Sequence, residues 1–206
     1  MKRMVFLSVA LAAVVSVACT DNARNDIGTD VGGNGSIGTT GDADPNAVSA
    51  ADKRFFEDLS IANMAEVELG RMASERSTNA EVKKFGQMMV DDHTKAGEQL
   101  KALASQHNVI LPAGLDESHR ELRDKLAGLK GAEFDREYVT AMVDGHEGVV
   151  DQLESRIDTT SPSAVVPEKD DNLVTMGVNQ WAAEAYPVVQ RHLEAAERLE
   201  GNLEKK

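Results

Sequence analysis

Cysteine is nearly absent from this sequence, whose 206 residues contain one thiol, Cys19. That cysteine lies in an N-terminal segment that we interpret below as a targeting signal. With Cys19 committed there, the rest of the chain cannot form an internal disulfide, a metal site built on thiolates or a cysteine nucleophile. Chemistry in the folded part of the chain must therefore come from other side chains.

Basic residues are also few: 22 Lys and Arg stand against 35 Asp and Glu, giving a net charge of −13. Removing residues 1–18, which contain two basic and no acidic residues, leaves a net charge of −15. Such a surface repels nucleic acid and anionic lipid head groups, so we exclude nucleic acid as a partner. It attracts cations and basic proteins, but a solvated acidic surface is the simpler interpretation. The sequence identifies neither a protein partner nor an oligomeric state.

The longest apolar run, residues 4–15, is too short to form a permanent transmembrane helix. It follows Lys2 and Arg3 and precedes small residues, which is typical of a cleaved signal peptide. Ser16-Val17-Ala18 before Cys19 matches the lipidation site of a bacterial lipoprotein, except that Ser16 stands where leucine is usual. We therefore predict a lipoprotein signal at residues 1–18 and a lipid on Cys19.

A lipid on Cys19 would anchor the protein to a membrane of the cell envelope. Thr20 follows the cysteine, whereas an aspartate there commonly retains lipoproteins in the inner membrane. The predicted location is therefore the outer membrane, facing the periplasm. The alternative is cleavage after Ala18 and release as a soluble periplasmic or secreted protein.

Large apolar residues are almost missing from residues 19–48, which are rich in Gly, Asp, Asn and Thr. Such a segment cannot bury a core, so it is predicted to be a disordered tether. Over residues 49–206, proline is scarce and apolar residues recur at spacings of three and four, which indicates amphipathic helices. Aromatic residues make up 4% of the chain.

The spacing predicts four long helices and one short one, which together favour an all-α fold, an antiparallel four-helix bundle. The short extra helix lies between helices two and three. A Thr-x-x-Glu capping box at Thr78 and Glu81 is expected to open helix two. The predicted ranges are 52–76, 78–107, 117–129, 132–157 and 171–203, with a loop at 158–170.

Two stretches share the pattern Met-Val-Asp-x-His, at residues 89–93 and 142–146. Their histidines, His93 and His146, fall near the middle of the apolar stripes of helices two and three. His192 has the same position on helix four, and Glu66 on helix one. Measured along the helix axes from the turn that joins helices one and two, Glu66 and His93 differ in position by about 6 Å. Helical side chains tilt toward the N-terminus of their own helix, and in an antiparallel pair this tilt brings the two side chains together. We expect one central polar layer, with Glu66 close to His93.

The other histidines and the repeat aspartates are predicted to be exposed. His107 stands at a helix end and His119 on a short polar helix. Asp91 and Asp144 precede their histidines by two residues, which places them on roughly the opposite helix face.

Two interpretations of the layer stay open. A buried imidazole costs free energy unless it is hydrogen-bonded, so converging histidines need a shared partner. One such partner is a divalent metal ion, since neutral imidazole and carboxylate suit iron, zinc, copper or manganese. The other interpretation is a His–Glu hydrogen-bond network without metal, and a lone histidine on an apolar stripe is usually a core residue of that kind.

A di-iron centre is not favoured. The pattern in such bundles includes Glu-x-x-His on two helices. Here, valines precede the three histidines by three positions, at Val90, Val143 and Val189. The sequence therefore argues against a di-iron site that activates oxygen. We predict no catalytic residue.

Three segments carry a resemblance to a known family: Asn63 to Ala104, Gly131 to Val150 with the second Asp-x-His, and Tyr186 to Glu200, with Pro187 five residues before His192. Together they closely resemble the bacterial family called domain of unknown function 4142, over about residues 53–203. Its members are often labelled outer-membrane proteins and are similar to ferritin-like bundles. The family has no established activity. The resemblance implies a ferritin-like fold, an envelope location and a site at the bundle centre.

The sequence thus favours an envelope lipoprotein whose bundle binds a divalent metal through Glu66, His93, His146 and His192. The alternative is a structural or protein-interaction module without metal, in which the buried histidines form a hydrogen-bond network. A ferritin-like redox enzyme is a third hypothesis, which the missing Glu-x-x-His motifs oppose.

Overall fold

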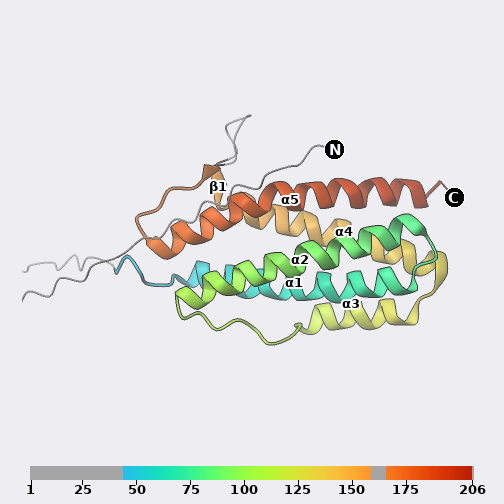
Figure 1. Ribbon diagram of the computed structural model, residues 1–206, viewed down its shortest axis with the longest axis horizontal. Helices are drawn as coiled ribbons and strands as arrows, with labels where there is room; N and C mark the ends of the chain where they lie inside the picture. The colour runs from blue at the N-terminus through green and yellow to red at the C-terminus, as the bar shows by residue number, and fades with distance from the viewer. Residues whose placement is uncertain (1–43, 159–165, 206) are drawn as a thin grey trace, which may run out of the picture. The chain divides into compact units, whose positions relative to one another are not determined.

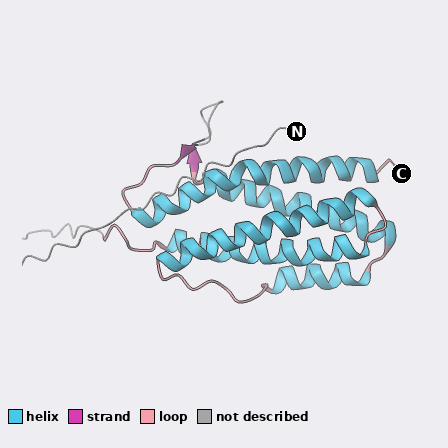
Figure 2. Cartoon of the chain, viewed as in Figure 1, coloured by secondary structure: helices cyan, strands magenta, loops and turns pink. Residues whose placement is uncertain are grey.

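The structure of the protein is a computed structural model that describes residues 44–158 and 166–205. The predicted signal at residues 1–18, Cys19 and the predicted tether up to residue 43 lie outside the described residues. Five helices and one short strand pair make up the described part of the chain (Figure 2). They are α1 (Ala50–Arg76), α2 (Ala80–Gln106), α3 (Glu117–Gly128), α4 (Gly131–Glu154), β1 (Ile157–Asp158), β2 (Val166–Pro167) and α5 (Leu173–Leu203).

The four long helices α1, α2, α4 and α5 lie side by side as a bundle, which confirms the predicted all-α fold (Figure 1). Helix α1 packs mainly on α2, and α4 packs mainly on α5. The short helix α3 lies outside the bundle and contacts α1 and α4. It carries the chain back along α1, so that α4 begins at the end of the bundle where α2 also begins (Figure 1).

Two glycines let α1 and α2 approach closely. A Cβ atom on Gly70 or on Gly86 would lie 2.7 Å from the carbonyl oxygen of the other residue. Since real Cβ atoms do not come that close to backbone, any larger residue would push the two helices apart. This contact therefore fixes the spacing of the helix pair that carries Glu66 and His93.

The histidine-bearing level divides the apolar core into two clusters. One cluster contains Phe56, Leu100 and Trp181 and lies toward the start of α1. The other contains Phe85, Tyr138 and Leu199 and lies toward the end of α1. Each of the two clusters takes residues from α1, α2, α4 and α5, so the level between them is a polar layer enclosed by apolar layers.

Two predictions of local structure were wrong. Helix α2 is capped by Asn79, whose side chain accepts a hydrogen bond from the Glu81 backbone N–H. The expected box at Thr78 does not form, because the helix starts one residue later and asparagine caps helices as well as threonine does. The region predicted to be a loop, 158–170, contains β2, which pairs with β1, and Ile157 of β1, predicted as the end of helix three, lies opposite Pro167. Strands of two residues are too short to give an alternating pattern in the sequence.

The residues just before α1 are attached to the start of α5. The Leu173 backbone N–H donates to the Pro45 carbonyl at 2.7 Å, and the Asn172 side chain donates to the Ala47 carbonyl at 2.8 Å. Val48 packs against the core. Residues 44–48, at the end of the segment predicted to be a tether, are therefore attached to the helical bundle.

Candidate metal centre

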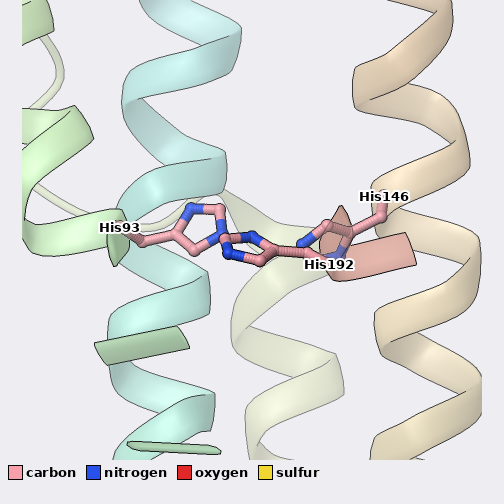
Figure 3. Close-up of side chains that lie close together, drawn as sticks. All are labelled: His93, His146 and His192. Carbon is pink, nitrogen blue, oxygen red and sulfur yellow. The ribbon is translucent and has the colours of Figure 1, made fainter. Parts of the chain in front are cut away.

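Three histidines from three helices meet at the centre of the bundle. His93 on α2, His146 on α4 and His192 on α5 are 9%, 2% and 2% exposed. Their ring centroids are separated by 5.5, 5.3 and 5.5 Å. Figure 3 shows the rings turned toward one another from separate helices. The predicted convergence of the three imidazoles in one layer is therefore present in the structure.

The spacing of the ring nitrogens suits a shared ion. One nitrogen from each ring lies within 4.8 Å of one nitrogen from each of the other two. Nitrogens that bind one zinc ion at about 2.0–2.1 Å lie roughly 3.4 Å apart in a tetrahedral site, so small rotations of the side chains would bring these three into bonding range. Among the described residues, this is the group that has such geometry.

Each ring has one nitrogen on an oxygen acceptor that belongs to the protein. His93 Nδ1 donates to Asn63 Oδ1 at 3.1 Å, and His146 Nδ1 donates to the Met142 carbonyl at 2.8 Å. His192 Nε2 donates to Asp92 Oδ2 at 2.9 Å. Because these oxygens have no hydrogen to give, the proton of each neutral ring is assigned to that nitrogen.

The other nitrogen of each ring is buried and lacks a hydrogen-bond partner within the described chain. These atoms are His93 Nε2, His146 Nε2 and His192 Nδ1. With the proton held on the opposite nitrogen, each keeps a free lone pair. A histidine that binds a metal typically has this arrangement, with its far N–H on a carboxylate, carbonyl or similar acceptor. The chemistry of the layer therefore fits a divalent ion.

Burial keeps the three rings neutral at pH 7. Burial, together with the nearby His146 and His192, lowers the pKa of His93 well below its usual value. Burial and the charge of His192 lower the pKa of His146 to about 4, against the opposing hydrogen bond from its ring to the Met142 carbonyl. Burial also lowers the pKa of His192, although Asp92 acts in the opposite direction. Neutral imidazole is the form that binds metal.

Glu66 lies beside His146, and the expectation that it would sit next to His93 was wrong. Glu66 Oε1 is 3.7 Å from His146 Nδ1, too far for a hydrogen bond. Asn63, one turn earlier on α1, takes the place beside His93. Burial raises the pKa of Glu66 to about 8. The Tyr138 hydroxyl lies near enough for the charge of Glu66 to add to burial in raising its own pKa.

Asn63 and Asp92 are site residues that the sequence analysis missed. A second bond, from Asn63 Nδ2 to the Leu59 carbonyl at 2.8 Å, fixes the amide so that its oxygen faces His93. Asp92 is the variable position of the first Met-Val-Asp-x-His stretch. The same position in the second stretch is Gly145, where a Cβ would lie 3.5 Å from Glu66 Oε1. The residue just before the histidine therefore lies next to the site in both copies of the pattern. Its place beside each histidine is visible in the sequence.

The repeat aspartates and the remaining histidines lie outside the layer. Asp91 and Asp144 are exposed, as predicted. His107 and His119 are partly exposed. His119 Nδ1 lies 2.7 Å from Asp116 Oδ1, close to the start of α3.

A cavity of about 310 Å³ adjoins the layer inside the bundle. The three histidines, Asn63, Glu66 and Asp92 form one part of its lining. The histidine layer therefore forms one end of a cavity large enough for a small molecule.

Comparison with protein families shows that the model of the family described as Domain of unknown function (DUF4142) matches residues 38–199. No curated protein matches the chain. The solved structures contain no match either. In the described part of the chain, no helix has both the length and the apolar character needed to cross a membrane.

Proposed function

We propose a function for this chain, which belongs to the family described as Domain of unknown function (DUF4142), from the chemistry of its histidine layer. The layer binds one divalent metal ion through His93, His146 and His192. Imidazole ligands suit zinc, copper and iron, and a nearby carboxylate also admits manganese. We assign no catalytic activity to the protein.

One observation carries this proposal: three buried histidines bring one ring nitrogen each within 4.8 Å of the others, and each ring has a buried nitrogen without a donor in the described part of the chain. A hydrogen-bond network without metal needs donors for these atoms. The rings cannot supply them to one another, because each N–H already points to a separate oxygen. Glu66, which its raised pKa keeps protonated at pH 7, makes no hydrogen bond to a free ring nitrogen in the described chain. A metal ion satisfies all three lone pairs at once, so it accounts for the geometry better than a network does.

Glu66 remains a proposed fourth ligand. Its Oε2 is buried and has no hydrogen-bond partner among the described residues. The side chain approaches the layer from α1, the helix that supplies no histidine. A carboxylate in this position would also reduce the positive charge of a buried ion.

Metal content tests the proposal. We expect protein purified without chelators or a histidine tag to contain about one equivalent of metal per chain, measured by elemental analysis. His146→Ala should lose it, whereas His107→Ala, outside the layer, should keep it. Circular dichroism of both variants checks that they are folded. Equal metal content in the wild type and a folded His146→Ala protein would eliminate the site.

We also propose that the protein is an envelope lipoprotein, held by a lipid on Cys19 at the outer membrane and facing the periplasm. The support is the signal-like sequence of residues 1–18. Cys19→Ser should move the protein from the membrane fraction to the soluble fraction. Unchanged fractionation of this variant would refute the anchor and leave the metal proposal untouched.

A further inference from the structure

The cavity beside the histidine layer has a wall that is more apolar than polar. Leu59, Leu153, Trp181, Val188 and Val189 are among its lining residues, which also include the carboxylates of Glu66, Asp92 and Glu184. Trp181 and His192 are eleven residues apart on α5, which separates them by about 16 Å along the helix. The lining therefore leads from the polar layer to a large aromatic side chain three turns away.

The opening of the cavity lies between α2 and α5. The exposed residues of its lining come from these two helices, and they are Lys95, Gln99, Glu184 and Arg191. Glu66, His146 and the lining residues from α1 and α4 are at least partly buried. A small molecule would enter the cavity between α2 and α5 and reach the histidines at its buried end.

The three histidines alone leave an ion incompletely coordinated, and in this inference an external ligand takes the fourth position in place of Glu66. Three protein ligands with a fourth, open position is the arrangement of zinc sites that bind an exogenous molecule. Three neutral imidazoles also leave the full double positive charge of the ion in a buried site, where an unpaired charge is costly. An anionic group that arrives through the cavity would fill the open position and reduce that charge.

The volume and the lining of the cavity limit the size and the polarity of a ligand that fits. A cavity of about 150 Å³ holds one benzene molecule, and this one is about twice that size. Small-molecule sites generally combine apolar walls with a few polar groups at one end. A ligand that fits must therefore have an apolar body and one compact polar head.

We propose that the cavity binds a small monocarboxylate, with its apolar body along the wall that leads to Trp181 and its carboxylate on the metal ion. This inference depends on the proposed metal site, because the ion is the partner of the carboxylate. The residues that select the ligand are then the apolar side chains of the cavity, with the histidines serving as its anchor through the metal.

Cobalt-substituted protein gives a direct test, because the visible spectrum of Co²⁺ reports its ligands. We expect benzoate to change the spectrum of the full mature chain loaded with Co²⁺ and to change the fluorescence of Trp181, the only tryptophan in the sequence. Acetate has the carboxylate but no aromatic ring, and benzyl alcohol has the ring but no charge. Each should bind at least about tenfold more weakly than benzoate. Acetate binding as tightly as benzoate would overturn the role of the cavity.

A cavity-filling variant supplies the matched control. Ala185 lines the cavity two turns before His192 on α5, so Ala185→Leu should fill it and weaken benzoate binding by about tenfold or more. Ala102→Leu makes the same change at an exposed position of α2 and should leave benzoate binding unchanged. Both variants should still bind Co²⁺. Equal benzoate affinity in the two variants would overturn the proposed position of the ligand.

The two proposals fail in different ways. If no Co²⁺ binds to the wild type, the metal site itself is wrong. If Co²⁺ binds and benzoate leaves its spectrum unchanged, the metal site stands and the monocarboxylate inference falls. Glu66 as the fourth ligand would produce this second result, and benzoate binding restored by Glu66→Gln alone would still count against the inference for the natural chain.

Discussion

Two buried polar clusters in this bundle differ in whether their atoms have partners. Near the start of α1, Asp52 is fully buried, yet both of its carboxylate oxygens are hydrogen-bonded. Arg156 donates to Oδ1 at 2.7 Å, and Ser49 and Thr175 donate to Oδ2 at 2.6 and 2.8 Å. In the histidine layer, each ring has one satisfied nitrogen and one that is buried without a partner in the described chain.

The contrast separates a structural cluster from a binding cluster. The Asp52 cluster joins three parts of the chain: the start of α1, the start of α5 and the segment that follows α4. Its hydrogen bonds all come from the protein itself. The histidine layer is complete only on its outer side, where Asn63, the Met142 carbonyl and Asp92 hold the rings. Its inner side is available to a ligand. Polar burial alone therefore does not identify a site; unsatisfied and converging polar atoms do.

Breaking the structural cluster should have the largest effect on stability. Asp52→Ala leaves Arg156, which is 13% exposed, without its carboxylate. Removing one partner of a buried ion pair costs about 3–5 kcal/mol. Urea denaturation should show this loss, and Asp58→Ala, an exposed position on the same helix, should change stability by less than about 0.5 kcal/mol. Similar losses in the two variants would contradict the structural role.

The histidine layer should instead make the metal-free protein sensitive to mild acid. The pKa of His146 is about 4 in the folded chain, below its value of about 6.5 when unfolded. As pH falls below 6.5 the unfolded chain takes up a proton first, so stability is full above pH 6.5 and decreases down to about pH 4. The loss from His146 alone is on the order of 3 kcal/mol.

Glu66 acts in the opposite direction, so this measurement needs a paired design. Its pKa of about 8 means that its contribution to stability is present below pH 4.5 and is lost as pH rises toward 8. Glu66→Gln removes this effect. In chelator, the Glu66→Gln protein should lose stability from pH 6.5 to 4, and the double variant with His146→Leu should lose clearly less. Parallel profiles for the two proteins would show that His146 does not cause the loss.

The oxygens that hold the rings should control metal affinity more than folding. Asn63→Ala removes the acceptor of His93, and loss of such an outer partner typically weakens metal binding 10–100-fold. Asp92 is 46% exposed on its side chain, so water can replace it and Asp92→Ala should weaken binding less. Competition titration against a chromophoric chelator measures both. A larger effect at Asp92 would reverse the assigned importance of the two residues.

Replacing a layer histidine should have the smallest effect on stability. His146→Leu keeps a similar volume and removes a buried nitrogen that has no partner in the described chain. The metal-free variant should unfold at an equal or higher urea concentration, with a free energy of unfolding up to about 1 kcal/mol greater than that of the wild type. It should also lose metal binding. A strong loss of stability in chelator would place this histidine with Asp52 as a structural residue.

The sequence predicted the four long helices and the histidine layer because both follow from the spacing of apolar residues along one helix. His93, His146 and His192 each lie on an apolar stripe near the middle of a helix, so antiparallel packing brings them to one level. One helix end differs from the prediction: α4 ends at Glu154, before the predicted 157, since the chain turns there into β1.

The partners of the histidines could not be predicted in this way. Whether Asn63 or Glu66 faces His93 depends on how far α1 slides along α2, and a shift of one turn exchanges them. The close contact of Gly70 with Gly86 helps to set that shift, and it depends on the shape of both helices. The contact between Asp92 and His192 joins residues 100 positions apart and depends on how α5 is rotated.

Anomalous diffraction from crystals of the zinc-loaded protein, recorded at the zinc absorption edge, would show whether the three histidines bind a metal ion. We expect one strong peak in the bundle centre, about 2.0–2.1 Å from His93 Nε2, His146 Nε2 and His192 Nδ1. Asn63, the Met142 carbonyl and Asp92 should keep their bonds to the opposite nitrogens. A fully folded bundle with no peak at this layer, or with zinc bound only at other residues, would contradict this expectation.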